Sequence, residues 1–334
     1  MKKINVAING FGRIGRVFFR CAFNHPDINI VAINDITDSA TLAHLLKYDS
    51  VHRRFPGEIT HDATHIFVNG KEVKIFASKD PEELPWKDLA IDVVIESTGL
   101  FLDKKSAQKH LNAGAKKIIL SAPAKDDDIR TIVMGVNDEQ LTAGDTIVSN
   151  ASCTTNCASP MLKVLKQWGI EEAYVTTVHS YTGDQRLHDA PHKDLRRARA
   201  AAMSIIPTST GAAKALGKIF PDLEDKLGGC GMRVPVPDGS LTDITCVLTD
   251  YPSVEQINSA FKEASENDLR GILEYSEDPL VSVDVIGNPH SVVFDSDFTS
   301  VVGNLVKVIG WYDNEYGYSN RLVDLLLKMQ QLKA

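Results

Sequence analysis

Cys153 lies in a sequence setting that favours a reactive thiol. An apolar run ending at Val148 is typical of a strand end, and apolar residues recur at helical spacing from Ala158 to Leu165, which predicts a helix beginning near Cys153. A thiol in the first turn of a helix lies at the positive end of the helix dipole, which favours the thiolate, the form that attacks carbonyl carbons. The alternative interpretation is a buried structural cysteine, the usual state of a free thiol. Cys157, one turn further along, is interpreted as a packing residue.

His179 is the candidate base for this thiol. It follows the apolar segment 173–178, which predicts a strand. A histidine at a strand end is more often structural. Beside a nucleophilic cysteine, however, it would form a thiolate–imidazolium pair that lowers the pKa of the thiol. The other nine histidines lack such a setting and are interpreted as surface or structural residues.

The N-terminal segment matches a dinucleotide-binding turn. A short apolar strand is predicted first, and Gly10, Gly12 and Gly15 follow it at G-x-G-x-x-G spacing. Such glycines allow a tight turn, close approach of a pyrophosphate, and close packing of the next helix on the strand. Asp35 lies 20 residues beyond Gly15, after a second predicted strand, where a carboxylate binds the adenosine ribose and repels a 2′-phosphate. The alternative is a nucleotide-free turn with a solvated aspartate.

Cofactor choice follows from the same residues. The Asp35 carboxylate favours NAD over NADP. Lys79 is a cation near the expected adenosine site and could tolerate a phosphate, so NADP is retained as a secondary cofactor.

Two kinds of domain are predicted around these residues. Over the first 150 residues strands and helices alternate, which predicts a doubly wound α/β Rossmann domain; from Cys153 onward longer strands predict an α+β domain with a mixed sheet. The expected strands of the first domain are 3–8, 28–33, 92–95, 117–120, 131–133 and 146–148, with a hairpin at Asn69-Gly70 between 65–68 and 72–76, and its helices are 13–24, 39–47 and 104–113. The expected strands of the second are 173–178, 231–236, 241–248 and 305–312, its helices 153–167, 211–219 and 254–265, and a final amphipathic helix covers 320–332.

Bulk composition excludes several classes of protein. A chain of 334 residues predicts two domains, and a formal charge of −8 with a pI near 5.7 gives no general nucleic-acid signal. The basic segment 193–199 is interpreted as a phosphate or subunit contact, with RNA binding as the alternative. Five cysteines without metal-like spacing predict free thiols in a reducing compartment and no metal site. We expect no signal peptide, since a strand starts almost at once, and no membrane span, so the predicted location is cytoplasmic.

Over essentially its whole length the chain resembles the phosphorylating glyceraldehyde-3-phosphate dehydrogenase family. The motifs that carry the resemblance are Asn9 to Gly15, Ser97-Thr98-Gly99, Ser121-Ala122-Pro123, Ser149 to Asn156, His179 with Thr182, Asp194 to Arg197, Thr210 to Lys214, Arg233-Val234-Pro235 and Trp311 to Glu315.

The resemblance implies oxidation of D-glyceraldehyde 3-phosphate to 1,3-bisphosphoglycerate with reduction of NAD. Cys153 would form a hemithioacetal and then a thioester, His179 would act as the base, and inorganic phosphate would displace the acyl group. It also implies a homotetramer, an NAD-binding domain over 1–152 and 316–334, and a catalytic domain over 153–315.

The resemblance also implies a set of binding residues. Those expected to bind the cofactor are Gly10, Phe11, Gly12, Arg13, Ile14, Gly15, Asp35, Lys79, Thr98, Ser121 and Asn314, the last at the nicotinamide carboxamide. Those expected to bind the substrate phosphate are Thr182, Arg197 and Arg233, and those expected to bind inorganic phosphate are Ser152, Thr154, Thr210 and Gly211, with Arg233 serving both. Arg196 and Arg199 could exchange roles with Arg197, and Thr210-Gly211 could be an ordinary helix cap.

Two segments depart from the common pattern of the family. Ala190 stands where many NAD-specific members carry leucine, and Pro237-Asp238-Gly239-Ser240 differs from the usual Pro-Asn-Val-Ser type of segment. Both leave an NADP-preferring biosynthetic form as an alternative. An erythrose-4-phosphate dehydrogenase is a second alternative, although the intact segment 209–214 and Tyr181-Thr182 favour the three-carbon substrate. A non-catalytic binding protein on the same fold predicts loss of Cys153, His179 or the glycine motif, and all three are present.

Overall fold

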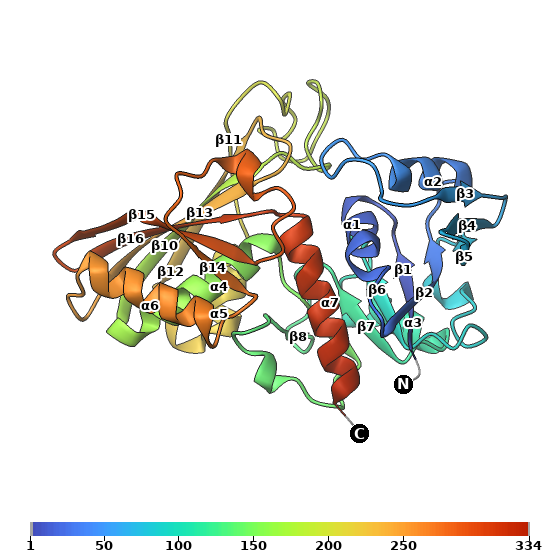
Figure 1. The fold of residues 1–334 in the computed structure, drawn as a ribbon, viewed down its shortest axis with the longest axis horizontal. Coiled ribbons are helices and arrows are strands. Elements are labelled where there is room, and N and C mark those ends of the chain that lie inside the picture. The colour runs from blue at the N-terminus through green and yellow to red at the C-terminus, as the bar shows by residue number, and fades with distance from the viewer. Residues whose placement is uncertain (1–2, 333–334) are drawn as a thin grey trace. The chain divides into compact units, whose positions relative to one another are not determined.

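The computed structural model describes residues 3–332 and divides into two compact units (Figure 1). The first unit comprises Met1–Ile132, Glu139–Ala151 and Ser319–Ala334, and the second comprises Val133–Asp138 and Ser152–Tyr318. These bounds differ from the expected ones chiefly at Val133–Asp138. This short segment belongs to the second unit, and there its Gly135 carbonyl accepts a hydrogen bond from the Lys163 ammonium over 2.7 Å.

The first unit is built on a nine-stranded sheet that is parallel over most of its width. Its strand order is β3-β4-β5-β2-β1-β6-β7-β9-β8, with only β3, β4 and β5 paired antiparallel. The strands are β1 (Ile4–Asn9), β2 (Ile28–Asn34), β3 (Ile59–His61), β4 (His65–Val68), β5 (Lys71–Phe76), β6 (Val93–Glu96), β7 (Lys117–Leu120), β8 (Arg130–Thr131) and β9 (Ile147–Ser149). This is the predicted doubly wound sheet, and β1 lies at its centre. In such sheets ligands bind at the loops that follow the carboxyl ends of the strands, here those after β1, β6 and β7.

Helices α1 (Arg13–Ala22), α2 (Ser39–Lys47) and α3 (Lys104–Asn112) connect the strands of this sheet. Aspartates begin two of them, since Asp38 accepts from the Thr41 amide over 2.9 Å and Asp103 accepts from the Ser106 amide over 2.8 Å. The last helix, α7 (Tyr316–Gln331), returns to this unit from Ser319 onward. Its Met329 carbonyl accepts a hydrogen bond from Lys117 over 2.5 Å.

The second unit is built on a seven-stranded mixed sheet. Its strand order is β11-β12-β10-β13-β16-β15-β14, with β10–β12 and β14–β15 paired parallel and the others antiparallel. The strands are β10 (Ile170–Ser180), β11 (Ile206–Thr208), β12 (Leu227–Val234), β13 (Ser240–Leu248), β14 (Leu273–Ser276), β15 (Val292–Val302) and β16 (Leu305–Tyr312). Helices α4 (Cys153–Leu165), α5 (Ala212–Ile219) and α6 (Val254–Glu266) cover one face of this sheet (Figure 1).

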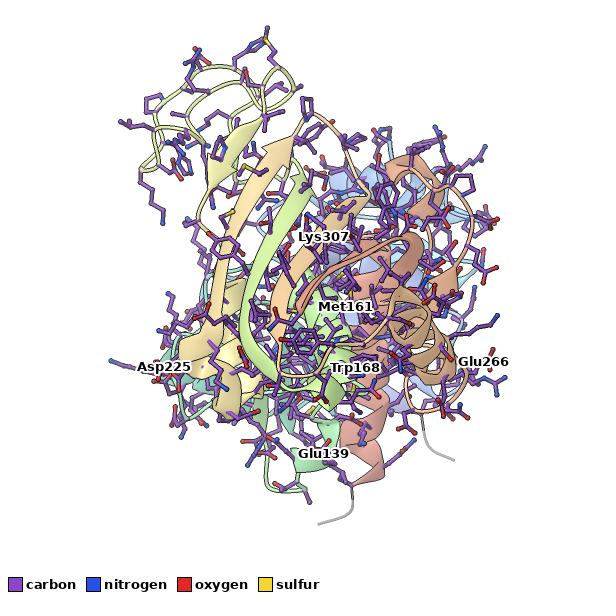
Figure 2. The ribbon with its side chains drawn as sticks, turned by 90° about the vertical axis from the view of Figure 1, so that its left-hand side faces the viewer. Glu139, Met161, Trp168, Asp225, Glu266 and Lys307 are labelled. Carbon is purple, nitrogen blue, oxygen red and sulfur yellow. The ribbon has the colours of Figure 1, made fainter. Side chains whose placement is uncertain are left out.

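Burial alternates along the central strands, so the sheet has one covered and one open face. Met161 of α4, labelled in Figure 2, is fully buried, and a Cβ placed on Gly310 of β16 would lie 2.8 Å from its sulfur. On the open face Tyr174 is 50% exposed and Leu305 44%. Lys307, also labelled in Figure 2, pairs there with Asp243.

Most predicted elements are confirmed, with shifts of one to four residues at their ends. Two predictions were wrong in extent: the strand expected over 131–133 is Arg130–Thr131, and the last helix begins at Tyr316 instead of Asn320. Strand β15 was not predicted because Asp295, Ser296 and Asp297 interrupt its apolar run; Asp295 is nevertheless buried, where it accepts from the Trp311 indole N–H over 2.9 Å.

Further short elements were also not predicted. They are β3, β11 and β14, and the 3₁₀ helices Pro81–Glu83, Asp138–Gln140, Lys166–Trp168, Pro221–Lys226 and Ser282–Val285. Among residues 3–332, no helix is both long and apolar enough to cross a bilayer.

Candidate active site

Cys153 is the first residue of helix α4. Ala151, two residues before it, has a φ of 55°, which turns the chain sharply as it leaves β9. Ser152 caps the helix, and its hydroxyl accepts a hydrogen bond from the Thr155 amide over 3.1 Å. The prediction of a cysteine in the first turn is confirmed, and the amides of that turn have no carbonyl partner within the helix.

His179 lies beside this thiol. Its Nε2 is 3.4 Å from Cys153 Sγ, and its Nδ1 lies 2.7 Å from the Ser180 carbonyl oxygen and also contacts the Arg233 guanidinium. With its proton on Nδ1, where the Ser180 carbonyl accepts it, the imidazole presents Nε2 as the acceptor that faces the sulfur. The ring of Tyr312 packs edge-on to the imidazole, with ring centroids 6.0 Å apart.

Burial acts against charge on either member of the pair. Desolvation raises the pKa of the Cys153 thiol to about 11, although Arg233 and the Thr154 amide oppose it. Desolvation and the neighbouring Arg233 lower the pKa of His179 to about 3. For the thiol taken alone, desolvation outweighs the Arg233 charge and the amide hydrogen bonds that favour the thiolate. Proton transfer from Sγ to Nε2 creates two opposite charges together, so the two groups titrate as a pair.

A cluster of anion-binding side chains lies in the same unit. The parallel pairing of β10 with β12 sets Arg233 directly beside His179, and Arg233 Nη1 donates to the Ser180 carbonyl over 3.0 Å. Arg233 Nε is buried and has no hydrogen-bond partner within residues 3–332. A buried guanidinium N–H without a partner fits an anionic ligand.

Asp184 joins two of the predicted phosphate ligands. Its carboxylate accepts from the Thr182 hydroxyl, and Arg197 Nη1 donates to it over 2.5 Å. Although desolvation opposes it, the Thr182 hydrogen bond and the charges of Arg233 and Arg197 lower the pKa of Asp184. Arg196 is exposed, and Arg199 pairs instead with Asp189 at 3.1 Å. Sequence reasoning missed Asp184, which follows Thr182 by only two residues.

The expected inorganic-phosphate ligands are already partly engaged. Thr154 is buried, and its hydroxyl contacts the Tyr312 hydroxyl at 2.9 Å. Thr210 precedes helix α5, and its Oγ1 accepts from the Ala212 amide, in the first turn, over 3.2 Å. Gly211, at the N-cap position, has open space around its Cα. The ligand and cap interpretations of Thr210-Gly211 are therefore both compatible with this geometry.

In the first unit, the glycine turn has the shape that a dinucleotide needs. Gly10 has a φ of 90°, and a Cβ there would lie 2.7 Å from the Thr98 amide nitrogen. A Cβ on Gly15 would lie 2.2 Å from the Gly10 carbonyl oxygen, which explains the close packing of α1 on β1. Gly12 has no neighbour within 4 Å of an added Cβ, so a phosphate can approach its backbone and the start of α1.

The other predicted cofactor residues of this unit lie at the carboxyl ends of neighbouring strands. Asp35 Oδ2 accepts from the Phe11 amide over 2.7 Å and thereby holds the glycine turn. Thr98 follows β6, Ser121 follows β7, and Lys79 lies in the exposed loop after β5. Arg13 and Ile14 begin α1, where the Arg13 guanidinium pairs with Asp49 at 2.6 Å.

A buried polar network beneath this turn was missed by sequence reasoning. Glu96 is fully buried and accepts from the Thr98 amide over 2.8 Å and from the Asn9 side chain over 2.5 Å. His110 Nε2 lies 3.1 Å from the same carboxylate, while its Nδ1 accepts from the Trp86 indole over 3.0 Å. His110 is thus a structural residue, as expected, and it positions the Thr98 loop through Glu96.

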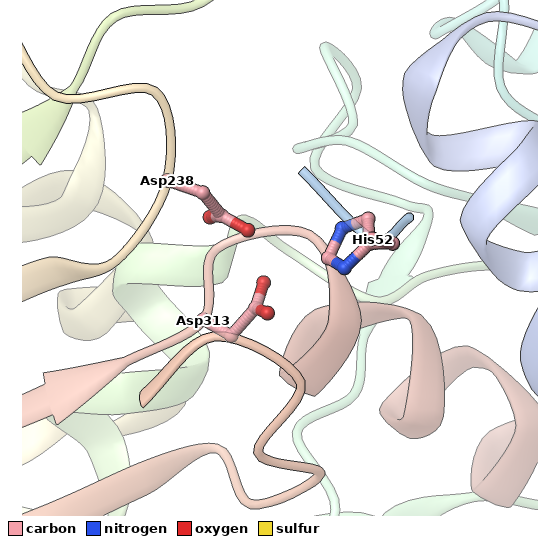
Figure 3. Close-up of side chains that lie close together, drawn as sticks. All are labelled: His52, Asp238 and Asp313. Atoms are coloured by element: carbon pink, nitrogen blue, oxygen red, sulfur yellow. The ribbon is translucent and has the colours of Figure 1, made fainter. Parts of the chain in front are cut away.

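Asp238 belongs to a pair of facing carboxyl groups in the second unit. Figure 3 shows its side chain directed at that of Asp313. Figure 3 also labels His52, which belongs to the other unit. Asp313 accepts from the amides of Gly287, Glu315 and Tyr316 at 2.6–2.9 Å. Desolvation, with the charges of Asp313 and Glu315, raises the pKa of Asp238 to about 9.

Asp238→Asn should therefore stabilise the protein in a pH-dependent way. The folded wild type retains a proton on Asp238 between its ordinary pKa of 3.8 and about 9, whereas the unfolded chain does not. Because the unfolded state binds fewer protons in this window, the free energy of unfolding of the wild type falls as the pH rises through it. An asparagine has the same shape as the aspartic acid but carries no titrating proton.

The measurement is the thermal midpoint of both proteins from pH 4.5 to 8.5. We expect the variant to exceed the wild type by about 2 °C or more at pH 8, with a smaller gap at pH 4.5. Asp250→Asn, at an exposed aspartate of the same unit, is the matched control. Parallel pH curves for Asp238→Asn and the wild type would show that Asp238 is ionised in the folded protein.

Sequence comparison finds relatives over nearly the whole chain. The profile of the glyceraldehyde 3-phosphate dehydrogenase NAD binding domain matches residues 4–104, and the profile of the C-terminal domain matches residues 152–314. The chain is 57% identical to glyceraldehyde-3-phosphate dehydrogenase of Thermotoga maritima over 331 residues, 97% of this chain and 99% of the relative. It is 56% identical to the protein of that name from Geobacillus stearothermophilus over 325 residues, 96% of this chain and 97% of the relative. It is 55% identical to glyceraldehyde-3-phosphate dehydrogenase 2 of Streptomyces avermitilis over 326 residues, 96% and 97% of the two chains.

Proposed function

The chain belongs to the glyceraldehyde-3-phosphate dehydrogenase family, and on this premise we propose how its residues perform the phosphorylating oxidation of D-glyceraldehyde 3-phosphate. It is an NAD-dependent oxidoreductase of glycolysis and gluconeogenesis that forms 1,3-bisphosphoglycerate. One observation supports the assignment of nucleophile and base. Cys153, in the first turn of α4, has its Sγ 3.4 Å from Nε2 of His179, near the end of β10.

The pair supplies a nucleophile and a base at one point. His179 Nε2 takes the thiol proton as Cys153 Sγ bonds to C1 of the aldehyde, and the proton passes to the carbonyl oxygen to give a hemithioacetal. The Cys153 amide, in the first turn of α4, donates to the oxygen while it carries negative charge. When bound, NAD supplies the acceptor for the hydride of C1. His179 removes the hydroxyl proton in that step, and Cys153 then holds the acyl group as a thioester.

The anion-binding residues account for the two phosphates of the reaction. Thr182, Arg197 and Arg233 gather around Asp184 and hold the substrate phosphate, while the buried Arg233 Nε remains to bind an anion. Ser152, Thr154, Thr210 and Gly211 form the inorganic-phosphate side. Inorganic phosphate displaces Cys153 Sγ from the thioester, and the sulfur recovers the proton held by His179. The product is an acyl phosphate.

Initial rates of reduced-cofactor formation test this function. The substrates are glyceraldehyde 3-phosphate and erythrose 4-phosphate, each with NAD or NADP and with or without inorganic phosphate. We expect phosphate-dependent NADH formation from the three-carbon aldehyde. The relatives that cover nearly the full chain carry the name of the three-carbon enzyme, so the erythrose 4-phosphate alternative is not favoured. Turnover of erythrose 4-phosphate alone would overturn the substrate assignment.

NAD is bound by the first unit through the glycine turn and Asp35. Asp35→Asn should keep the hydrogen bond to the Phe11 amide but remove the charge that repels a 2′-phosphate. We therefore expect the ratio of kcat/KM for NADP to that for NAD to rise about 5-fold or more. Asp35→Gly removes the charge and the hydrogen bond together, so it should also weaken NAD binding. An unchanged cofactor ratio in both variants would show that Asp35 does not contact the ribose.

A homotetramer is supported by apolar side chains that the single chain leaves exposed. Leu187, Leu195 and Met203, in the long loop between β10 and β11, are 76%, 82% and 79% exposed, and the open face of the second sheet adds Tyr174 and Leu305. Exposed apolar side chains of this size are available for contacts between subunits. A cytoplasmic location is supported by the five cysteines, which are all free thiols, as expected in a reducing compartment. Sedimentation equilibrium tests the assembly, and a monomer at all concentrations would contradict it.

A further inference from the structure

The side chain of Asn314 is held by two serine hydroxyls. Ser180 is the last residue of β10 and Ser240 the first residue of β13, and their Oγ atoms donate to Asn314 Oδ1 over 2.8 Å and 2.6 Å. The Ser180 backbone N–H donates to Ser240 Oγ over 3.1 Å. All three side chains are buried, with exposures of 5% or less. The contacts come from three separate segments of the chain.

This network determines which end of the Asn314 amide is presented to a ligand. Because Ser240 Oγ accepts from a backbone N–H, its own hydrogen is available to point at Asn314 Oδ1. The carbonyl oxygen has two lone pairs, and the two hydroxyls occupy both. The Nδ2 group, a pure donor, is therefore the end of the amide that a ligand meets. In a buried setting these hydrogen bonds are stronger than they would be in water.

The backbone beside Ser240 is sterically constrained. Gly239, next to Ser240, has a φ of 82°, and a Cβ there would lie 2.0 Å from the Ser282 carbonyl oxygen, so only glycine fits. The carboxyl groups of Asp238, before Ser240, and Asp313, before Asn314, face each other, and each accepts from a backbone amide, Asp238 from Gly239 over 2.9 Å and Asp313 from Gly287 over 2.7 Å. The backbone before Ser240 and the backbone before Asn314 therefore both help to hold the Ser240 hydroxyl beside the Asn314 amide.

We propose that Ser180 and Ser240 are positioning residues that keep Asn314 Nδ2 directed at the nicotinamide carboxamide, and so determine which face of the nicotinamide ring meets the substrate. This inference rests on the proposed function, because it takes Asn314 as the ligand of the carboxamide.

The link to the ring face follows from the chemistry of the cofactor. The carboxamide lies on one side of the nicotinamide ring, and half a turn about the bond to the ribose exchanges the two faces and moves the carboxamide across. A donor fixed in one place binds the carboxamide oxygen in only one of the two ring orientations. An Asn314 amide free to turn over presents its oxygen instead and accepts from the carboxamide NH₂, which weakens the preference.

The test compares Ser240→Ala and Ser180→Ala with the wild type. The first readout is the Kd for NAD without substrate, from quenching of tryptophan fluorescence. Loss of one hydrogen bond to the amide should raise this Kd about 3- to 10-fold. The second readout is facial selectivity: glyceraldehyde 3-phosphate deuterated at C1 is turned over, and the deuterium is located on either face of the reduced cofactor by NMR.

Facial selectivity would stay unchanged if Ser180 and Ser240 had only a structural role. The wild type should place deuterium on one face, and each variant should raise the fraction on the other face about tenfold or more above the wild-type level. Ser296→Ala is the matched control, because Ser296 is a buried serine of the same unit whose hydroxyl donates to the Ser276 carbonyl over 2.8 Å. The control should keep the wild-type Kd and selectivity.

The outcomes separate this inference from the proposed function. Absence of turnover in the wild type would overturn the proposed function. A productive wild type whose Ser240→Ala and Ser180→Ala variants keep both Kd and single-face transfer would overturn the inference alone. If one variant fails to fold, the other decides, since each removes one of the two bonds to Oδ1. Asn314→Ala should lose selectivity at least as far as either serine variant, and unchanged selectivity there would also overturn the inference.

Discussion

Cys153→Ser is expected to lose at least about 10⁴-fold in the rate of NADH formation, while the Kd for NAD stays within about twofold of the wild type. The replacement keeps the shape of the side chain but substitutes an alcohol for the thiol. His179 Nε2 can accept a thiol proton across 3.4 Å, but a serine hydroxyl is a far weaker acid and nucleophile. The hemithioacetal and thioester therefore do not form.

Steady-state rates and a fluorescence titration with NAD measure the two quantities. Cys157→Ser is the matched control, because this buried cysteine lies in the same helix with its sulfur 3.8 Å from the Gly310 carbonyl. We expect the control to retain turnover. Substantial turnover by Cys153→Ser would remove Cys153 from the role of nucleophile.

His179→Asn should slow hydride transfer by about 10²–10⁴-fold, the usual contribution of a positioned acid or base. Asparagine is similar in width and can still donate to the Ser180 carbonyl, so the end of β10 should keep its conformation. It cannot take the hydroxyl proton of the hemithioacetal. The loss should appear in kcat and in the single-turnover rate, with little change in the Kd for NAD.

A single-turnover measurement of NADH formation isolates this step from product release. His290→Asn is the control, since His290 is a half-buried histidine of the same unit that contacts Asn288 at 2.9 Å. It should turn over at the wild-type rate. Unchanged single-turnover kinetics for His179→Asn would exclude this residue as the base.

The features that were predicted correctly depend on neighbours in the chain. The glycine turn, the strand before it and the helix after it share one stretch of about twenty residues, and the structure gives Gly10 and Gly15 the backbone constraints that their spacing indicated. Helix α2 and strand β16 have the predicted bounds because their periodicity is uninterrupted. Strand β15 was missed because polar residues interrupt its apolar run, and one of them, Asp295, is buried by a contact with Trp311 of the later strand β16.

The roles of charged groups could not be predicted in the same way. The sequence does not distinguish Arg196, Arg197 and Arg199 as phosphate ligands. In the structure only Arg197 contacts Asp184, while Arg199 pairs with Asp189. Similarly, Asp238 appeared as a departure from a family segment, and its effect depends on Asp313, 75 positions later. Such pairings depend on strand register and loop packing, which local spacing does not encode.

The sequence by itself determined the two kinds of domain, the dinucleotide turn, and the presence of a cysteine in a first helical turn with a histidine at a strand end. These follow from periodicity and from the backbone freedom of glycine, which act over a few residues. Only the tertiary structure decided that His179 Nε2 faces the sulfur, that burial opposes charge on the lone thiol, and that two serines hold Asn314. The physical reason is that desolvation and hydrogen-bond partners are set by groups brought together from distant parts of the chain.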